Sequence, residues 1–344
     1  IGGYFVQMVA QLLTVVVAAA SVFAGAGNGF AAVPVPPDQP TPFVHPPDAL
    51  HPECVIEIQP RDSLSVIAEE MPDTAVSYED LQDENGIADA DRIESGDYLD
   101  ICVGNQINDI TGETRGADSG DIVDDAVAVQ QRKINELFAG RGMPQLAVDG
   151  VSGPLTKQQL CAIRSAFGLP VNRADMAPGS AEEQLLMSAV TLPAQVGAPD
   201  RWVLIDMTCQ IMFAGDSTSI VFVFPTSTGE TGYETREQQG VSAFRFDPAI
   251  DNDGWHDSTV FPAASDNPLN GNMYKPVYFD NGQAIHGSYN VPPEPLSKGC
   301  ARLLVEHQDA LLAWLGLGDA TSQIWSADRI NLTVNARGQF LPDS

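Results

Sequence analysis

The stretch IHGSYNVPPEPLSKGCAR, residues 285–302, carries the most structural and chemical information in this chain. It places His286 and Cys300 on either side of a proline-rich spacer. A thiol attacks as the thiolate, so a nucleophilic cysteine needs a base or a positive charge beside it. His286 can accept the thiol proton, and Gly299 lets backbone amides approach an oxyanion. The stretch therefore predicts a cysteine acyl-transfer site.

The residues before His286 predict how it is positioned. Asn281-Gly282 lies between the apolar runs 277–279 and 283–286, which is the strongest short signal for a β-hairpin. His286 then falls at the end of the returning strand. The prolines of the spacer exclude a helix or a central strand, so we expect a stiff loop that returns Cys300 to His286. The alternative is a buried structural cysteine and an unrelated histidine.

Residues 285–302 resemble the signature of the L,D-transpeptidase catalytic domain, the YkuD domain. That signature consists of His-Gly, a spacer, and Ser-His-Gly-Cys with an arginine two residues later. The resemblance spans about residues 201–337 and includes 203–206, 227–229 and 273–279. It implies that Cys300 is the nucleophile and His286 the base. It also implies that the carbonyl of Gly287 or Ser288 holds the imidazole, and that Arg302 braces the cysteine loop.

The resemblance further implies which residues contact the substrate. Lys298 stands where the family usually has a histidine, and lysine donates but cannot accept a hydrogen bond. A substrate contact at this position is therefore expected to differ, with Ser297 and Gly287 beside it. Trp255 and Tyr274 come from a segment rich in Gly, Asn and aromatic residues. We expect that segment to cover the site and limit water; the alternative is an ordinary long loop with a packed tryptophan.

The reaction that these residues imply is a two-step acyl transfer without a cofactor. Cys300 attacks a peptide carbonyl, His286 protonates the leaving amine, and a thioester forms. A second amine then attacks, with His286 as base. By the resemblance, the donor is a peptidoglycan stem tetrapeptide that loses its terminal D-alanine. The acceptor is a diamino-acid side chain of a neighbouring stem.

The N-terminal region indicates export. Residues 4–26 are almost wholly apolar and uncharged, long enough to cross a bilayer, and small residues follow. We expect residues 1–31 to be a signal peptide or a membrane anchor, and 32–53 to be a Pro-rich linker. The remainder is then expected in the cell envelope or the extracellular cell wall, with membrane contact only through the N-terminal segment.

The five cysteines suit an oxidising compartment. Pairing Cys54 with Cys102 and Cys161 with Cys209 leaves Cys300 alone, which suits a nucleophile. The other pairings stay open, because four cysteines allow three connectivities. Cys161 is expected in a helix, and Cys209 in a strand.

Two small modules are expected before the catalytic region. Residues 54–103 have a strand–helix–helix–strand pattern and resemble the LysM module, which binds N-acetylglucosamine chains, although Arg61 stands where that module usually has glycine. An acidic, Gly-rich linker is expected at 104–123. Residues 124–171 resemble a three-helix peptidoglycan-binding domain, the alternative being a helical spacer. A connector with one helix is expected at 172–200.

The catalytic region, 201–337, is expected to be mainly β. Residues 202–213, 220–224 and 330–334 have strand patterns, and 306–315 has a helix pattern. We therefore predict a multidomain α+β chain. Its catalytic domain is a YkuD-like β-sandwich, preceded by a βααβ LysM-like module and a small all-α peptidoglycan-binding domain.

Charge and motif content exclude several functions. The net charge of −29 would repel nucleic acid. The five histidines are scattered without ligand spacing, so no metal site is predicted, and no phosphate-binding Gly loop is present. We expect a monomer whose partner is peptidoglycan, through both its stem peptides and its glycan strands. Two alternatives remain: a cysteine hydrolase of wall peptides, and a non-catalytic wall-binding protein.

Overall fold

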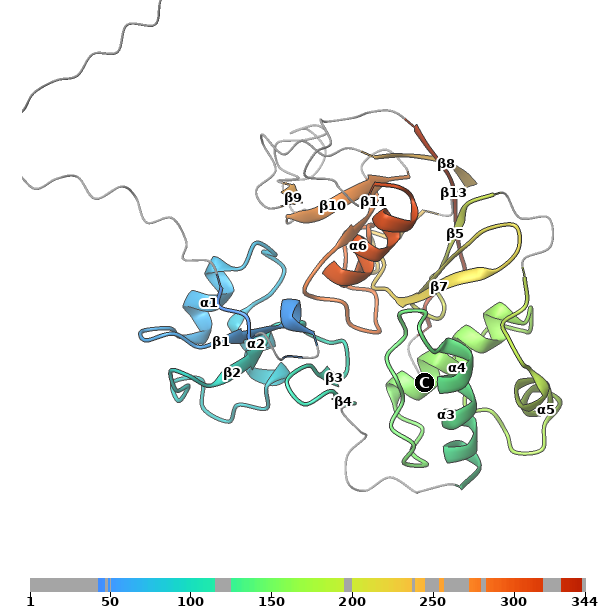
Figure 1. Ribbon diagram of the computed structural model, residues 1–344, viewed down its shortest axis with the longest axis horizontal. Coiled ribbons are helices and arrows are strands. Elements are labelled where there is room, and N and C mark those ends of the chain that lie inside the picture. The colour runs from blue at the N-terminus through green and yellow to red at the C-terminus, as the bar shows by residue number, and fades with distance from the viewer. Residues whose placement is uncertain are drawn as a thin grey trace, which may run out of the picture. The chain divides into compact units, whose positions relative to one another are not determined.

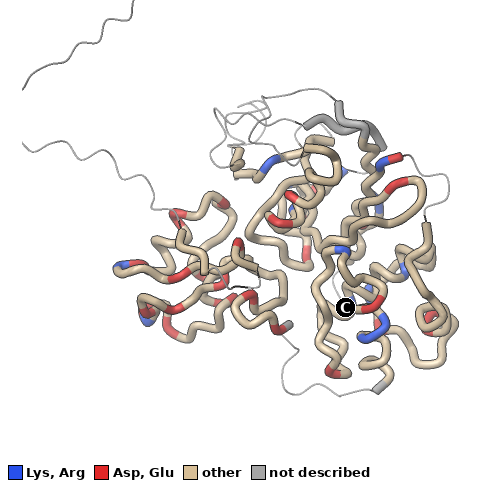
Figure 2. Tube along the Cα trace, viewed as in Figure 1, with Lys and Arg blue, Asp and Glu red and all other residues tan. Residues whose placement is uncertain are grey.

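The computed structural model (Figure 1) shows two small N-terminal regions and a large mixed sheet. The predicted signal peptide or anchor lies outside the described residues. None of the helices in the described part has the length and apolar character needed to span a bilayer. Acidic residues are spread over the described part of the trace (Figure 2), in line with the net charge of −29. The structure describes residues 43–46, 49, 51–114, 125–194, 200–236, 239–244, 254–256, 272–279, 283–317 and 329–341.

The first region, which we call the N-terminal module (residues 51–114), has the predicted order of strand, helix, helix and strand. Both helices begin at a serine cap: the Ser63 hydroxyl accepts from an amide of the first turn, and Ser77 forms a capping box. The amide of Asn85 makes 2.8 Å hydrogen bonds to both the backbone N–H and the carbonyl of Asp100, which joins the second helix to the second strand. Its elements are η1 Pro52–Cys54, β1 Val55–Glu57, α1 Leu64–Glu70, α2 Tyr78–Glu84 and β2 Tyr98–Asp100, with β1 and β2 antiparallel.

Part of the predicted acidic linker is folded against this module. Strands β3 Ile107–Asn108 and β4 Glu113–Thr114 form a short hairpin. Asn105 and Asp109 are buried, and the Asp109 N–H donates to the Asp100 carboxylate at 2.9 Å. These polar anchors explain why a segment with a linker composition takes a fixed shape.

The second region holds three helices, α3 Asp125–Phe138, α4 Pro154–Ala166 and α5 Ala181–Ser188. Helix α4 begins with proline at its first position, where no N–H is needed. The Arg164 side chain is 1% exposed and binds the Glu182 carboxylate at 3.0 Å. Leu160 and Phe138 pack in one cluster with residues of the sheet, so these helices cover one sheet face.

The strands of the catalytic region form one continuous hydrogen-bonded sheet, where the sequence predicted a sandwich. The order is β12-β11-β10-β8-β13-β5-β6-β7, and β9 pairs with β10. Alternate residues of strand β5 pack on opposite faces of the sheet. Trp202 and Leu204 belong to the cluster that the helices cover. Val203 and Ile205 belong to a second cluster, which includes residues of helix α6 Val305–Trp314. The strands are β5 Trp202–Asp206, β6 Ile211–Gly215, β7 Ile220–Pro225, β8 Gln239–Phe244, β9 Trp255–His256, β10 Met273–Tyr278, β11 Ala284–Gly287, β12 Ala301–Leu303 and β13 Arg329–Arg337.

The run 202–213, predicted as strand throughout, is two strands joined by a tight turn. Gln210 has a φ of 54°, and its side-chain amide donates to the Met207 carbonyl at 2.7 Å. The Asp206 carboxylate accepts the Cys209 N–H at 3.3 Å. Cys209 therefore lies in the turn and not in a strand. Side-chain hydrogen bonds override the apolar pattern here.

Both disulfides suggested by the cysteine spacing are present. Cys54 binds Cys102 within the N-terminal module, and Cys161 of α4 binds Cys209. Cys300 is a free, buried cysteine. The second disulfide ties the helical region to the sheet that it covers.

Candidate active site

Strands β11 and β12 place His286 and Cys300 near one another. The two strands are parallel neighbours in which Ile285 faces Ala301 and His286 faces Arg302. Cys300 directly precedes β12 and packs in a cluster with Ala284. Because side chains alternate along a strand, His286, Arg302 and Cys300 belong to the same face of this pair. The proline-rich spacer is the crossover that a parallel pair requires.

The Cys300 thiol lies in an apolar environment. Its side chain is 5% exposed, and Sγ is 4.0 Å from the sulfur of Met273. Burial raises the pKa of the Cys300 thiol, while a backbone hydrogen bond from Ala284 and the charge of Arg302 act in the opposite direction. Burial has the largest effect, so the thiol is protonated at neutral pH.

His286 is buried on the same strand face as Cys300 and is held in one tautomer. Its Nδ1 is 2.9 Å from the Gly287 carbonyl. A carbonyl can only accept, so Nδ1 carries the proton and Nε2 keeps a free lone pair. Burial lowers the pKa of His286 to about 4, the Gly287 carbonyl opposes this, and the Arg302 charge adds to it. The ring is thus neutral at physiological pH and able to accept a proton.

The turn before Cys300 is fixed by hydrogen bonds. The Ser297 hydroxyl donates to the Cys300 carbonyl at 2.6 Å and accepts the Gly299 N–H at 3.1 Å. The Thr235 hydroxyl donates to the Gly299 carbonyl at 2.9 Å. Gly299 has a φ of 111°, and a Cβ there would lie 2.5 Å from Nε2 of Gln283. Glycine is therefore required by this turn, and its own N–H is bound within it.

The segment after His286 is held by a residue that the sequence did not indicate. The Ser288 hydroxyl donates to the Asp73 carboxylate, and the Tyr289 N–H donates to the same oxygen at 2.8 Å. Asp73 is 2% exposed and comes from the link between α1 and α2. Its partners lie more than two hundred residues away, so no local pattern could reveal it.

Arg302 and Lys298 both bind nearby segments of the same chain. The Arg302 N–H donates to the Ser227 carbonyl at 3.0 Å, and its side chain reaches the Asn290 carbonyl at 3.4 Å. Lys298 forms an ion pair with Glu230, and its ammonium lies 4.5 Å from the centre of the Tyr233 ring. Lys298 therefore binds the segment that contains Glu230 and Tyr233.

Trp255 and Tyr274 lie in a buried aromatic cluster. The Trp255 ring is 5.4 Å from that of Tyr274 and 5.2 Å from that of Tyr289, with which it stacks. This cluster packs with apolar residues of the N-terminal module, among them Leu99. The rest of the expected cover, residues 257–271, lies outside the described residues.

A pocket of about 830 Å³ opens beside the cysteine turn. Thr228 and Thr235 line it and also bind the turn: the Thr228 carbonyl accepts the Ser297 N–H at 3.0 Å, and Thr235 binds Gly299 as described above. The pocket therefore shares a wall with the segment that carries Cys300. Its lining includes three carboxylates, those of Glu230, Glu234 and Glu294.

Comparison with known proteins identifies the domain that carries this site. Residues 200–325 match the family model of the L,D-transpeptidase catalytic domain. The chain therefore contains a domain of this class, with both His286 and Cys300 inside the matched segment. No curated protein sequence matches the chain at a significant level.

Solved structures give weaker likenesses. An L,D-transpeptidase from Xylanimonas cellulosilytica is 24% identical, with 63% of this chain and 95% of that chain covered and a TM-score of 0.35. An L,D-transpeptidase from Stackebrandtia nassauensis is 17% identical, with 65% and 96% covered and a TM-score of 0.34. At such TM-scores the assignment rests on the family model.

Proposed function

We propose that the chain is an exported cysteine L,D-transpeptidase that cross-links peptidoglycan through a thioester at Cys300. The observation that carries this proposal is the shared strand face of His286 and Cys300 within the matched domain. The neutral, buried imidazole with Nε2 available as acceptor provides the base that a protonated thiol needs.

Cys300 and His286 together account for every proton transfer in the proposed reaction. As the Cys300 sulfur attacks the donor carbonyl, Nε2 of His286 takes the thiol proton. His286 then gives that proton to the departing D-alanine amine, which leaves a thioester on Cys300. The acceptor amine attacks the thioester, its proton passes to His286, and the thiol re-forms as the cross-linked product departs.

The pocket beside the cysteine turn is proposed to bind the acceptor stem. Glu230, Glu234 and Glu294 give it negative charge, which favours a substrate that carries an amine. Glu230 is paired with Lys298, and we assign recognition of the acceptor amine to Glu234. Lys298 and Ser297 would contact the substrate from the cysteine turn.

The preceding regions are proposed to bind the cell wall. The N-terminal module has the element order of a LysM domain, and we assign glycan binding to it. The helical region at 124–171 is assigned a peptidoglycan-binding role. Both disulfides are consistent with export to an oxidising compartment.

Purified protein incubated with tetrapeptide stems tests the proposed reaction. Mass spectrometry should detect dimeric stems and released D-alanine, and Cys300→Ala should abolish both. His286→Gln should slow the reaction by roughly two orders of magnitude or more, whereas His45→Gln, at an exposed histidine, should not. Free tripeptide without dimers would instead favour a hydrolase, and no turnover would favour a non-catalytic wall-binding protein.

A further inference from the structure

Three metal-binding side chains meet where the N-terminal module contacts helix α6. His51 precedes η1, Glu53 lies within it, and Glu306 lies in the first turn of α6. One ligand atom from each lies within 4.8 Å of the others. Nδ1 of His51 is 3.7 Å from Oε1 of Glu53. No local sequence pattern indicates this cluster, because Glu306 is far along the chain from the other two.

The cluster contains a buried oxygen that lacks a hydrogen-bond partner. That oxygen is Oε2 of Glu306. A bound cation would satisfy it.

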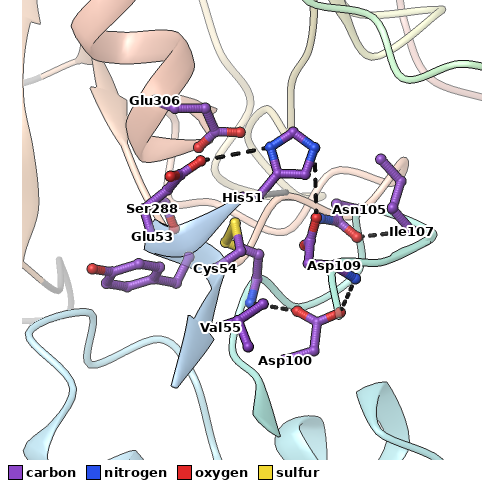
Figure 3. Close-up of a disulfide and its surroundings, with 12 residues drawn as sticks. His51, Glu53, Cys54, Val55, Asp100, Asn105, Ile107, Asp109, Ser288 and Glu306 are labelled. Atoms are coloured by element: carbon purple, nitrogen blue, oxygen red, sulfur yellow. Dashed lines mark hydrogen bonds and ion pairs between the residues drawn. A yellow bond between two sulfur atoms is a disulfide. The ribbon is translucent and has the colours of Figure 1, made fainter. Parts of the chain in front are cut away.

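Asp109 provides an independent sign of a metal site. Its side chain is 1% exposed, and its Oδ1 has no hydrogen-bond partner. That oxygen lies 4.0 Å from Nε2 of His51, on the opposite side of the ring from Glu53 (Figure 3). Asn105 holds the other Asp109 oxygen at 2.6 Å. A histidine that binds metal through one nitrogen usually donates its other N–H to a carboxylate, and Asp109 is a carboxylate close to that nitrogen.

We propose that His51, Glu53 and Glu306 bind a divalent transition-metal ion, with Asp109 orienting the imidazole. One nitrogen and two carboxylate donors fit Zn²⁺, whereas Ca²⁺ needs about six to eight oxygens. Zn²⁺ requires bond lengths of roughly 2.1 Å, so the three side chains would have to rotate to bring their ligand atoms around one ion. All three ligands are partly exposed, so water can complete the coordination. The ion would fasten the N-terminal module to α6.

Zinc binding by the full chain tests the site, with Cys300→Ala as the background so that the free thiol cannot act as a ligand. After removal of metal with a chelator, Zn²⁺ is titrated by calorimetry, and Co²⁺ is added separately to record its visible absorption. We expect one equivalent of Zn²⁺ to bind. The Co²⁺ spectrum should be that of an ion with a low coordination number. Glu306→Gln and His51→Gln should each weaken binding at least tenfold, and Asp109→Asn roughly tenfold.

Glu69→Gln and His45→Gln are the matched controls, because both residues are exposed and outside the cluster. Zn²⁺ should raise the unfolding temperature of the parent and of both controls but not of Glu306→Gln. Glu306→Gln is nearly isosteric, so circular dichroism should show a folded protein. Equal affinity in the parent and the cluster variants would overturn the proposal, as would an absence of saturable binding.

Discussion

The buried pair of His286 and Cys300 predicts an unusual pH dependence of thiol reactivity. The pKa of His286 is lowered to about 4, and that of Cys300 is raised above its ordinary value of 9.0. The resting state is therefore a neutral thiol beside a neutral imidazole, and not a thiolate–imidazolium pair. Reactivity towards an alkylating reagent reports the difference, because only the thiolate reacts.

The two pKa values determine the size of the effect. One pKa is lowered and the other is raised, so moving the proton from Cys300 to His286 is unfavourable and the ion pair is a minor species. Above pH 5 the reactive species is then the thiolate beside a neutral imidazole. Its population rises about tenfold per pH unit until the thiol titrates. The alkylation rate should rise about a hundredfold between pH 6 and pH 8.

Intact-mass measurement of iodoacetamide labelling in the full chain provides the assay. The parent should take up one label at Cys300, and Cys300→Ala should take up none. Glutathione labelled in parallel corrects the measured rates for changes in the reagent itself. A rate that changes less than about threefold from pH 5.5 to pH 7.5 would show a preformed ion pair. That plateau would refute the reasoning from burial.

Four further outcomes are expected. Cys161→Ser combined with Cys209→Ser should lower the free energy of unfolding by about 4 kcal/mol, because the disulfide joins residues 48 apart; a denaturant midpoint unchanged from the parent would contradict this. Gly299→Ala should lower the free energy of unfolding by about 1–3 kcal/mol and should reduce cross-linking. Alanine fits neither the positive φ nor the space at this position. His286→Gln should flatten the pH dependence of stability. The folded pKa of about 4 lies below the unfolded value of 6.5, so the neutral ring contributes about 3 kcal/mol of stability above pH 6.5, which is lost as the pH falls to 4. An unchanged slope would exclude a buried neutral ring. Glu234→Gln should raise the KM for the acceptor a few-fold and leave that for the donor unchanged, and an equal effect on both would reject the acceptor assignment of the pocket.

The sequence predicted the elements whose signals are local. The Asn281-Gly282 pair predicted the antiparallel pairing of β10 and β11, which the structure confirms. The apolar spacing near residues 306–315 predicted α6 to within one residue at each end. Such elements depend on turn chemistry and periodicity, which neighbouring residues determine.

Side-chain hydrogen bonds could not be predicted in the same way. The turn at Gln210 and the contact of Asp73 with Ser288 both depend on such bonds, which leave no periodic pattern. Trp255 and Tyr274 could equally have formed a cover over the site or a packed cluster, because aromatic composition suits both. Only the three-dimensional arrangement shows that they pack beside the N-terminal module.

The spacer between His286 and Cys300 is bound by both preceding regions. From the N-terminal module, Asp73 binds the start of the spacer as described above. The carbonyl of Val103 accepts the Val291 N–H at 3.2 Å. From the helical region, the Arg173 guanidinium donates to the Pro293 carbonyl at 2.7 Å.

These contacts make the preceding regions structural parts of the site. The spacer sets where β12 returns beside β11, and so where Cys300 lies relative to His286. If residues 43–199 were removed, the spacer would lose the buried carboxylate of Asp73, the backbone carbonyl of Val103 and the guanidinium of Arg173, each worth roughly 1–3 kcal/mol net. Prolines keep the spacer stiff but do not fix its direction. We infer that the N-terminal module and the helical region, whatever they bind on the cell wall, also hold the proposed nucleophile and base in register.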